Sequence, residues 1–329
     1  MTPLRPSRRA FLAAPLLAAT LGDVPAMAAD GDWNGFLAGI RRDAVAQGIQ
    51  ATTVDRTLSY VQYLPHVIEL DRRQPEHTMT FEEFIGKFVT PERKEQARRA
   101  AADNWPLLGQ VSRVYGVQPR FIVALWGIES AFGRITGNYL VPSALATLAY
   151  DGRRGTLFRS ELLAALRIVD QGDIHADQML GSWAGAMGQC QFMPSTFLHY
   201  AVDFDHDGRR DIWTDRADVL ASIANYIGHL GWHGDEGWGQ TAWVPQNFDT
   251  RYSGLQIRRP VAEWARLGVR SANGGAPVGH EIEASLVLPD GRTGPALLVY
   301  DNFRAIMRWN KSTFFAAAVG YLADSMARG

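Results

Sequence analysis

The sequence predicts a mainly helical α+β protein in which a small β-containing subdomain is inserted into a helical core. Apolar residues recur at helical spacing along most of residues 32–230, whereas short apolar runs separated by glycine and proline occupy residues 232–300. The chain has 329 residues, of which 47% are hydrophobic and 20% are charged. This length and composition predict a globular protein with a sizeable core and two or three subdomains.

Residues 1–29 have the pattern of an export signal. Ser7-Arg-Arg-Ala-Phe-Leu12 is twin-arginine-like, an apolar run follows from Ala10 to Leu21, and Ala26-Met-Ala28 is a small-residue cleavage motif. The run is too short to span a bilayer, and no cysteine follows it directly to carry a lipid. We therefore expect a soluble periplasmic protein without an integral membrane segment. The sequence leaves the choice between twin-arginine and general export open.

Net charge and cysteine content argue against two classes of function. The formal net charge is −1, which argues against electrostatic binding to nucleic acid. The single cysteine, Cys190, cannot form an internal disulfide. A nucleophilic Cys190 would need a histidine partner that no motif supplies, so a buried structural thiol is the favoured interpretation.

Residues 32–115 read as a series of helices. Thr80 is placed to cap a helix that begins at Phe81, with Glu82 and Glu83 in its first turn. Val89-Thr-Pro91 interrupts this pattern, and a charged helix with a solvated face resumes at Glu92.

The helix predicted over residues 119–133 carries the main catalytic candidate, Glu129. Pro119 suits a first turn, and Gly133 is placed to end the helix. One apolar stripe is formed by Phe121, Leu125, Ile128 and Phe132. Glu129 falls on or beside this stripe, where loss of hydration raises the pKa of a carboxyl group. A structural glutamate is the alternative interpretation.

The remaining elements follow in order. Further helices are expected over residues 142–149, 157–169, 217–230, 302–307 and 312–326. Strands are expected over residues 241–244, 282–288 and 296–300, with Pro289-Asp-Gly-Arg292 as a hairpin turn and a short helix over residues 260–267.

The acidic segment Asp203-Phe-Asp-His-Asp-Gly-Arg-Arg-Asp211 matches the start of a Ca²⁺-binding loop. Asp211 falls at the ninth position, but Thr214 stands where the twelfth-position glutamate is expected. The loop would then close on Asp215 or Asp218. An Asp-rich turn held by hydrogen bonds is the alternative.

Five motifs carry a resemblance to a known family. They are Trp126-Gly-Ile-Glu-Ser130, Ala144-Leu-Ala-Thr-Leu148, Gly185-Ala-Met-Gly188 with Gln191-Phe-Met-Pro-Ser195, Ala224-Asn-Tyr226 and Arg308-Trp-Asn-Lys-Ser312. With them the chain resembles the lytic transglycosylases of the membrane-bound lytic transglycosylase B type (glycoside hydrolase family 103), from about Asp32 to the C-terminus.

The resemblance implies a lysozyme-like helical catalytic core. The expected divisions are a signal peptide (1–29), a flanking α domain (30–115), the catalytic core with the EF-hand-like loop (116–240), a small β-containing subdomain (241–300) and a helical return to the core (301–329). The resemblance also implies which residues form the site. Glu129 would be catalytic, and the substrate-binding residues would be Ser182, Gln191, Tyr226, Trp309, Asn310, Arg153 and Arg154. The family more often has tyrosine at the position of Trp309, whose ring offers a stacking face for a pyranose.

Some of these residues have plain structural alternatives. Arg153 and Arg154 would approach the peptide stem of the substrate, or they are two solvated loop arginines. By pattern alone, Tyr226 could equally belong to the core. No catalytic cofactor is implied. A structural Ca²⁺ would be held by Asp203, Asp205, Asp207, the carbonyl of Arg209 and Asp218, because the family uses an enlarged loop that ends at the next helix.

The activity implied is cleavage of the MurNAc–GlcNAc bond of peptidoglycan with formation of 1,6-anhydromuramoyl ends. Glu129 would act first as acid and then as base. The sequence leaves Asp151 or Asp177 open as a second acid, which would suit a hydrolytic muramidase. A non-enzymatic wall-binding protein is the third interpretation. We expect a monomer whose partner is the peptidoglycan strand with its peptide stems.

Overall fold

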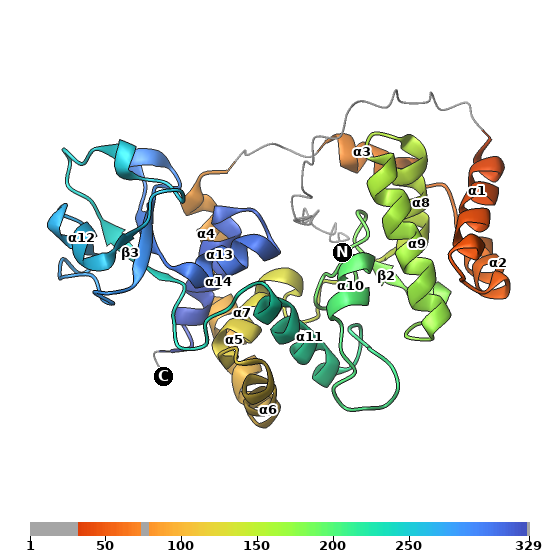
Figure 1. Cartoon of the computed structure of the whole chain (residues 1–329), viewed down its shortest axis with the longest axis horizontal. Coiled ribbons are helices and arrows are strands. Elements are labelled where there is room, and N and C mark those ends of the chain that lie inside the picture. The colour runs from red at the N-terminus through yellow and green to blue at the C-terminus, as the bar shows by residue number, and fades with distance from the viewer. Residues whose placement is uncertain (1–31, 74–78, 328–329) are drawn as a thin grey trace, which may run out of the picture. The chain divides into compact units, whose positions relative to one another are not determined.

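The computed structural model describes residues 32–73 and 79–327 (Figure 1). The export signal predicted over residues 1–29 lies outside them. Within the described residues, fourteen α-helices and a small sheet confirm the mainly helical α+β class. None of the helices in these two ranges combines the length and apolar character needed to cross a membrane.

The described chain divides into two compact units that interleave along the sequence. The first contains residues up to 72, 137–187 and 193–195, and the second contains residues 73–136, 188–192 and those from 196 onward. The domain ranges predicted from the sequence are consecutive, and they stay a prediction.

The first unit is a bundle of helices. They are α1 (Trp33–Ala46), α2 (Ala51–Ser59), α3 (Pro65–Arg72), α8 (Val141–Asp151) and α9 (Gly155–Gln171). The last two form a hairpin against which the first three pack (Figure 1). Gly152 (φ 85°) and Gly172 (φ 86°) adopt the left-handed conformation that ends α8 and α9, as the sequence predicted for Gly172.

The first unit also contains a two-stranded antiparallel ribbon. β1 (Tyr139–Leu140) pairs with β2 (Leu180–Gly181), which follows a 3₁₀ turn at Ala176–Gln178. The sequence analysis did not predict this ribbon because two-residue strands carry no periodic signal. Gly137 lies beside it with φ 96°, and a Cβ there would be 2.0 Å from the carbonyl oxygen of Gly181.

The second unit contains most of the remaining helices. They are α4 (Phe81–Phe88), α5 (Pro91–Asp103), α6 (Trp105–Tyr115), α7 (Pro119–Ser130), α11 (Arg216–His229), α12 (Val261–Arg266), α13 (Asp301–Trp309) and α14 (Thr313–Asp324). Helix α10 (Pro194–Tyr200) begins in the first unit and continues in the second. Thr80 caps α4 as predicted, in a reciprocal capping box with Glu83.

Helix α7 lies at the centre of the second unit. Every residue from Phe121 to Ile128 is buried, and α14, α5 and α11 pack around it. Gly127 allows the close approach of α14, because a Cβ there would be 2.7 Å from the Phe132 ring and 3.1 Å from Leu322. The helix is therefore apolar on all sides rather than along one stripe.

The small sheet is antiparallel, with the strand order β4-β6-β7-β3-β5. The strands are β3 (Gly239–Trp243), β4 (Arg259–Pro260), β5 (Arg270–Ser271), β6 (Glu283–Val287) and β7 (Ala296–Val299), with 3₁₀ turns at Thr250–Tyr252 and Gly291–Thr293. Helix α12 covers one face through the buried Trp264, whose Nε1 donates to the carbonyl of Ala284.

The connection between β6 and β7 is longer than the predicted hairpin turn. Val287 pairs with Leu297, so residues 288–296 lie between these paired positions and include a 3₁₀ turn. Asp290 in this connection accepts hydrogen bonds from the backbone N–H of Phe81 at 2.8 and 2.9 Å. The turn sequence is thus used to anchor α4 rather than to make a tight hairpin.

Substitution of Gly137 tests whether its backbone lies as close to Gly181 as the structure shows. Gly137→Ala should lower the free energy of unfolding by about 2–4 kcal/mol, since it combines a positive φ with a backbone clash. Gly48→Ala is the matched control, because Gly48 has φ 80° but no atom within 4 Å of the added Cβ. It should cost about 1 kcal/mol. Equal losses in urea unfolding would contradict the close approach of Gly137 to Gly181.

Candidate active site

Glu129 lies one residue before the end of the buried helix α7. The sequence placed the end at Gly133, but the helix ends at Ser130, and Ala131 (φ 53°) and Phe132 (φ 60°) are left-handed. Of the four non-glycine residues with positive φ in the described chain, these two lie two and three residues after Glu129, and a third is Gln191 (φ 53°). Such strained backbone persists only where the surrounding structure holds it, and it clusters at functional sites.

The carboxyl group of Glu129 is held by Trp309. The indole Nε1 of Trp309, the last residue of α13, donates to Oε1 of Glu129 at 2.7 Å. The Trp309 ring lies 4.7 Å from the ring of Tyr226 and 5.5 Å from that of Phe192, centroid to centroid. Tyr200 extends the row, 4.6 Å from Tyr226. Three helices and the segment before α10 thus bring together four aromatic rings, of which the indole of Trp309 bonds to the acid.

Burial sets the ionisation of Glu129. Loss of hydration raises its pKa from 4.5 to about 7, and the hydrogen bond from Trp309 acts in the opposite direction. The titratable groups that interact with it are Cys190, from the segment before Phe192, and Tyr226. Burial raises the pKa of both, so both are neutral near pH 7. Glu129 is therefore suited to give and to take a proton near neutral pH.

The Gln191 segment is anchored by its own amide groups. Gln191 Nε2 donates to the carbonyls of Thr136 (3.0 Å) and Gly188 (2.8 Å). The nearby Gln189 is buried, accepts from Trp126 Nε1 at 2.9 Å and donates to the carbonyl of Trp213 at 2.9 Å. Gln189 thus joins α7 to the segment before α11, a role that the sequence analysis did not identify.

Ser182 belongs to the first unit. Its buried Oγ accepts hydrogen bonds from the backbone N–H groups of Ala184 (3.3 Å) and Ala186 (3.0 Å), and so closes the tight loop over residues 182–186. A contact between Ser182 and the substrate stays a prediction.

Arg153 and Arg154 are ion-paired in the first unit rather than simply solvated. Both contact the buried carboxylate of Asp71, with Arg153 Nε donating at 2.6 Å. Asp151, one of the two candidates for a second acid, pairs with Arg72 at 2.7 Å. Asp177, the other, is exposed in a 3₁₀ turn.

Asn310 is buried at the joint between α13 and α14. Its Oδ1 accepts from the backbone N–H of Ser312 at 3.1 Å, and Ser312 in turn caps α14 by accepting from the N–H of Phe315. In the structure its oxygen therefore fixes the turn that follows Trp309. A sugar contact of this amide stays a prediction.

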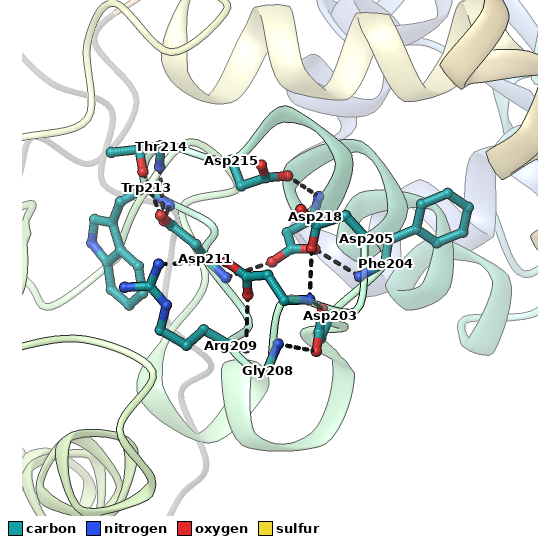
Figure 2. A network of polar contacts seen from close by, with 11 residues as sticks. Asp203, Phe204, Asp205, Gly208, Arg209, Asp211, Trp213, Thr214, Asp215 and Asp218 are labelled. Carbon is teal, nitrogen blue, oxygen red and sulfur yellow. Dashed lines mark hydrogen bonds and ion pairs between the residues drawn. The ribbon is translucent and has the colours of Figure 1, made fainter.

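The acidic loop brings three carboxylates together (Figure 2). Oxygen atoms of Asp203, Asp205 and Asp218 lie within 4.8 Å of one another. Asp218 is 1% exposed and accepts from the backbone N–H groups of Phe204 and Asp211, both at 2.7 Å. Burial raises its pKa to about 6, and the negative charges of Asp215 and Asp205 add to this effect.

Asp203 and Asp205 also accept hydrogen bonds from the backbone N–H of Asp207, and the other acids of the loop likewise bond to the backbone. Asp207 accepts from the N–H of Arg209 at 2.9 Å, and Asp211 accepts from the N–H groups of Trp213 and Thr214, both at 2.8 Å. Asp215 caps α11 (Figure 2). Of the two residues proposed to close the loop, Asp218 is the one that faces Asp203 and Asp205. The ligand roles of Asp207 and the Arg209 carbonyl stay predictions.

The site and the fold together define the class of protein. A carboxyl group with a pKa of about 7 beside a row of aromatic rings suits acid–base cleavage of a glycosidic bond. The family model described as "Transglycosylase SLT domain" matches residues 32–324. The chain belongs to this family, which confirms the resemblance found in the sequence.

Several known proteins are similar to the chain. SltB3 from Pseudomonas aeruginosa, solved in complex with NAG-anhNAM-pentapeptide, is 46% identical with a TM-score of 0.87, over 91% of this chain and 80% of that one. Slt35 from Escherichia coli, solved with calcium, is 30% identical with a TM-score of 0.76, over 89% and 92%. Membrane-bound lytic murein transglycosylase B of Escherichia coli (strain K12) is 35% identical over 248 residues. That match covers 73% of this chain and 66% of the relative, just under two thirds of its length.

The raised pKa of Glu129 should make stability fall with pH. Between about pH 4.5 and 7 the folded state holds a proton that the unfolded chain has lost, so the free energy of unfolding decreases as the pH rises. Relative to Glu129→Gln, the wild type should lose about 3 kcal/mol over this range. The exposed Glu95, paired with Arg99 on α5, provides the control Glu95→Gln, which should follow the wild type. Urea unfolding at several pH values measures the difference, and parallel curves for wild type and Glu129→Gln would contradict the burial of this acid.

Proposed function

We propose that the protein is a lytic transglycosylase that cleaves the β-1,4 bond between N-acetylmuramic acid and N-acetylglucosamine in peptidoglycan. The observation that carries this proposal is the single carboxyl group of Glu129, with a pKa raised to about 7 and an indole donor on one of its oxygens. Membership of the transglycosylase family and the peptidoglycan fragments bound by SltB3 support the choice of substrate.

In the first step Glu129 acts as a general acid. Its proton passes to the glycosidic oxygen while the bond from that oxygen to the anomeric carbon of muramic acid breaks. Near neutral pH about half of the molecules hold this proton when the pKa is about 7, so the acid form is available without an acidic medium.

In the second step the same residue acts as a general base. The resulting carboxylate takes the proton of the muramic 6-hydroxyl while its oxygen bonds to the anomeric carbon, which gives a 1,6-anhydromuramoyl end. Glu129 regains its proton and no water is consumed. Ordinary glycosidases need a second carboxylate because water or the enzyme itself supplies the nucleophile. Here the internal hydroxyl takes that role, so one carboxylate suffices.

The remaining predicted residues would hold the glycan and its stem. Tyr226 contributes a partly exposed aromatic ring next to Trp309, and Gln191 lies directly before the aromatic Phe192. We propose that Ser182 and Asn310 assist in placing the sugar. Arg153 and Arg154, which share Asp71, would meet carboxylates of the peptide stem, as bidentate guanidinium groups do well. Peptidoglycan as substrate also supports the expected export to the periplasm.

Product analysis of digested sacculi tests the activity. Wild-type protein should release fragments with anhydromuramoyl ends, and Glu129→Gln should lower the rate at least about 1,000-fold because the proton donor is lost. Glu95→Gln serves as a variant of equal charge change outside the site. Mass spectrometry separates the outcomes by the product terminus.

Two results would replace this proposal. Reducing muramoyl ends would identify a hydrolytic muramidase and direct attention to Asp151 or Asp177 as a second acid. Wall binding without products, unchanged in Glu129→Gln, would identify a non-enzymatic wall-binding protein.

We also propose that the acidic loop binds a structural Ca²⁺. The residues fit this ion because carboxylate oxygens of Asp203, Asp205 and Asp218 lie within 4.8 Å of one another, and Ca²⁺ is bound by oxygen ligands of this kind. Slt35, a relative with the same fold, was solved with calcium. Asp203, Asp205, Asp207, Asp218 and the Arg209 carbonyl would hold the ion, which would stabilise the segment between Gln191 and α11.

Chelation should therefore lower the melting temperature. With Ca²⁺ at about 100 times its dissociation constant, binding adds about 2.7 kcal/mol, which corresponds to roughly 5–10 °C. Asp218→Asn should abolish the difference between Ca²⁺ and EDTA. Asp249→Asn, which changes an acid that caps a 3₁₀ turn outside the loop, should keep it. The same melting temperature for wild type in both solutions would refute the proposal.

A further inference from the structure

The hydrogen bond between Trp309 and Glu129 gives the indole a role other than sugar stacking. The sequence predicted a ring that stacks on a pyranose, but the polar end of this ring is directed at the acid, with Nε1 at 2.7 Å from Oε1. An indole N–H donates and never accepts. Oε1 must therefore be an acceptor whenever this contact exists.

This restriction determines where the proton of Glu129 lies. If the neutral acid carried its proton on Oε1, the O–H group would compete with the indole N–H for the same region of that oxygen. If the proton is on Oε2, Oε1 keeps its carbonyl character and accepts from Trp309. We infer that Trp309 is a positioning residue that reserves Oε1 of Glu129 as an acceptor and so makes Oε2 the oxygen that gives and takes the proton. This inference rests on the proposed acid–base function of Glu129.

The surroundings hold the indole in this position. Its ring packs against Tyr226 from α11 and Phe192, with interplanar angles of 40° and 57°. The backbone after it is fixed, since Asn310 N donates to the carbonyl of Ile306 at 2.9 Å and Asn310 Oδ1 accepts from Ser312. The contact therefore depends on α13, α14 and α11 together, and does not rest on a free side-chain rotamer.

The bond also favours one charge state. A hydrogen bond to a carboxylate is stronger than one to a neutral carboxylic acid, so Trp309 stabilises the ionised form that the second step requires. Among the described residues, the thiol of Cys190 and the hydroxyl of Tyr226 interact electrostatically with Glu129, and neither carries a positive charge. The indole N–H thus opposes burial, which favours the neutral acid.

The test uses two NMR probes of the protein, the ¹⁵N–¹H group of Trp309 and the ¹³C-labelled carboxyl carbon of Glu129. In wild type both should titrate with one shared midpoint, and in Glu129→Gln the indole signal should stop responding to pH. In Trp309→Phe the midpoint of Glu129 should rise by about one pH unit, since a hydrogen bond to a charged group is lost. The alkaline limb of the pH–activity profile should move by the same amount, with kcat reduced more than KM is raised.

A second variant removes only the donor. Replacing Trp309 with its sulfur isostere 3-benzothienylalanine keeps the shape of the ring and deletes the N–H, so the same shift is expected even if Trp309→Phe disturbs packing. Trp243→Phe is the control, because Trp243 is 55% exposed on β3. It should leave the midpoint unchanged.

A raised KM with an unchanged Glu129 midpoint in both variants would show that Trp309 only stacks on sugar, and would overturn the inference. So would an indole signal that does not titrate in wild type. Because the midpoint is measured without substrate, failure of the inference is distinguishable from absence of transglycosylase activity.

Discussion

The desolvation of Glu129 at the end of α7 is the constraint on which the rest of the site depends. Every residue from Phe121 to Ile128 is buried and Glu129 itself is half-buried, so the helix places its acid where partial loss of hydration raises the pKa to about 7. An acid in such a place needs a polar partner, and Trp309 supplies one. The rings of Phe192 and Tyr226, which pack against the Trp309 indole, then line one side of the site.

Close backbone approach makes this arrangement possible. Gly127 admits α14 against α7, and Gly320 on α14 admits the ring of Trp238, whose Cδ2 would be 2.3 Å from an added Cβ. Packing at these glycines fixes α14 and with it the turn at Asn310, which follows Trp309. The left-handed Ala131 and Phe132 turn the chain sharply after the acid. The left-handed backbone of these two residues lowers the stability of the fold, and it holds the acid in one position.

In the acidic loop, charged side chains organise the backbone instead of acting as an acid or base. There all six acids accept hydrogen bonds from backbone N–H groups, and Asp203, Asp205 and Asp218 in addition face one another. Gln189 links this region to α7 by bonding to both Trp126 and the carbonyl of Trp213. The loop and the acid thus belong to one hydrogen-bonded framework, although their chemistry is separate.

The sequence by itself determined the helices with strong caps and periodicity, such as α4 behind Thr80 and α9 before Gly172, because those signals are local. It also identified Glu129 within a family motif and the alternating acids of the loop. It could not find the β1–β2 ribbon or the early end of α7, where long-range packing outweighs local preference. Only the tertiary structure decided that Trp309 bonds to the acid and that Arg153 and Arg154 share Asp71. Each of these depends on which atoms of distant segments meet, and spacing along a chain does not specify that.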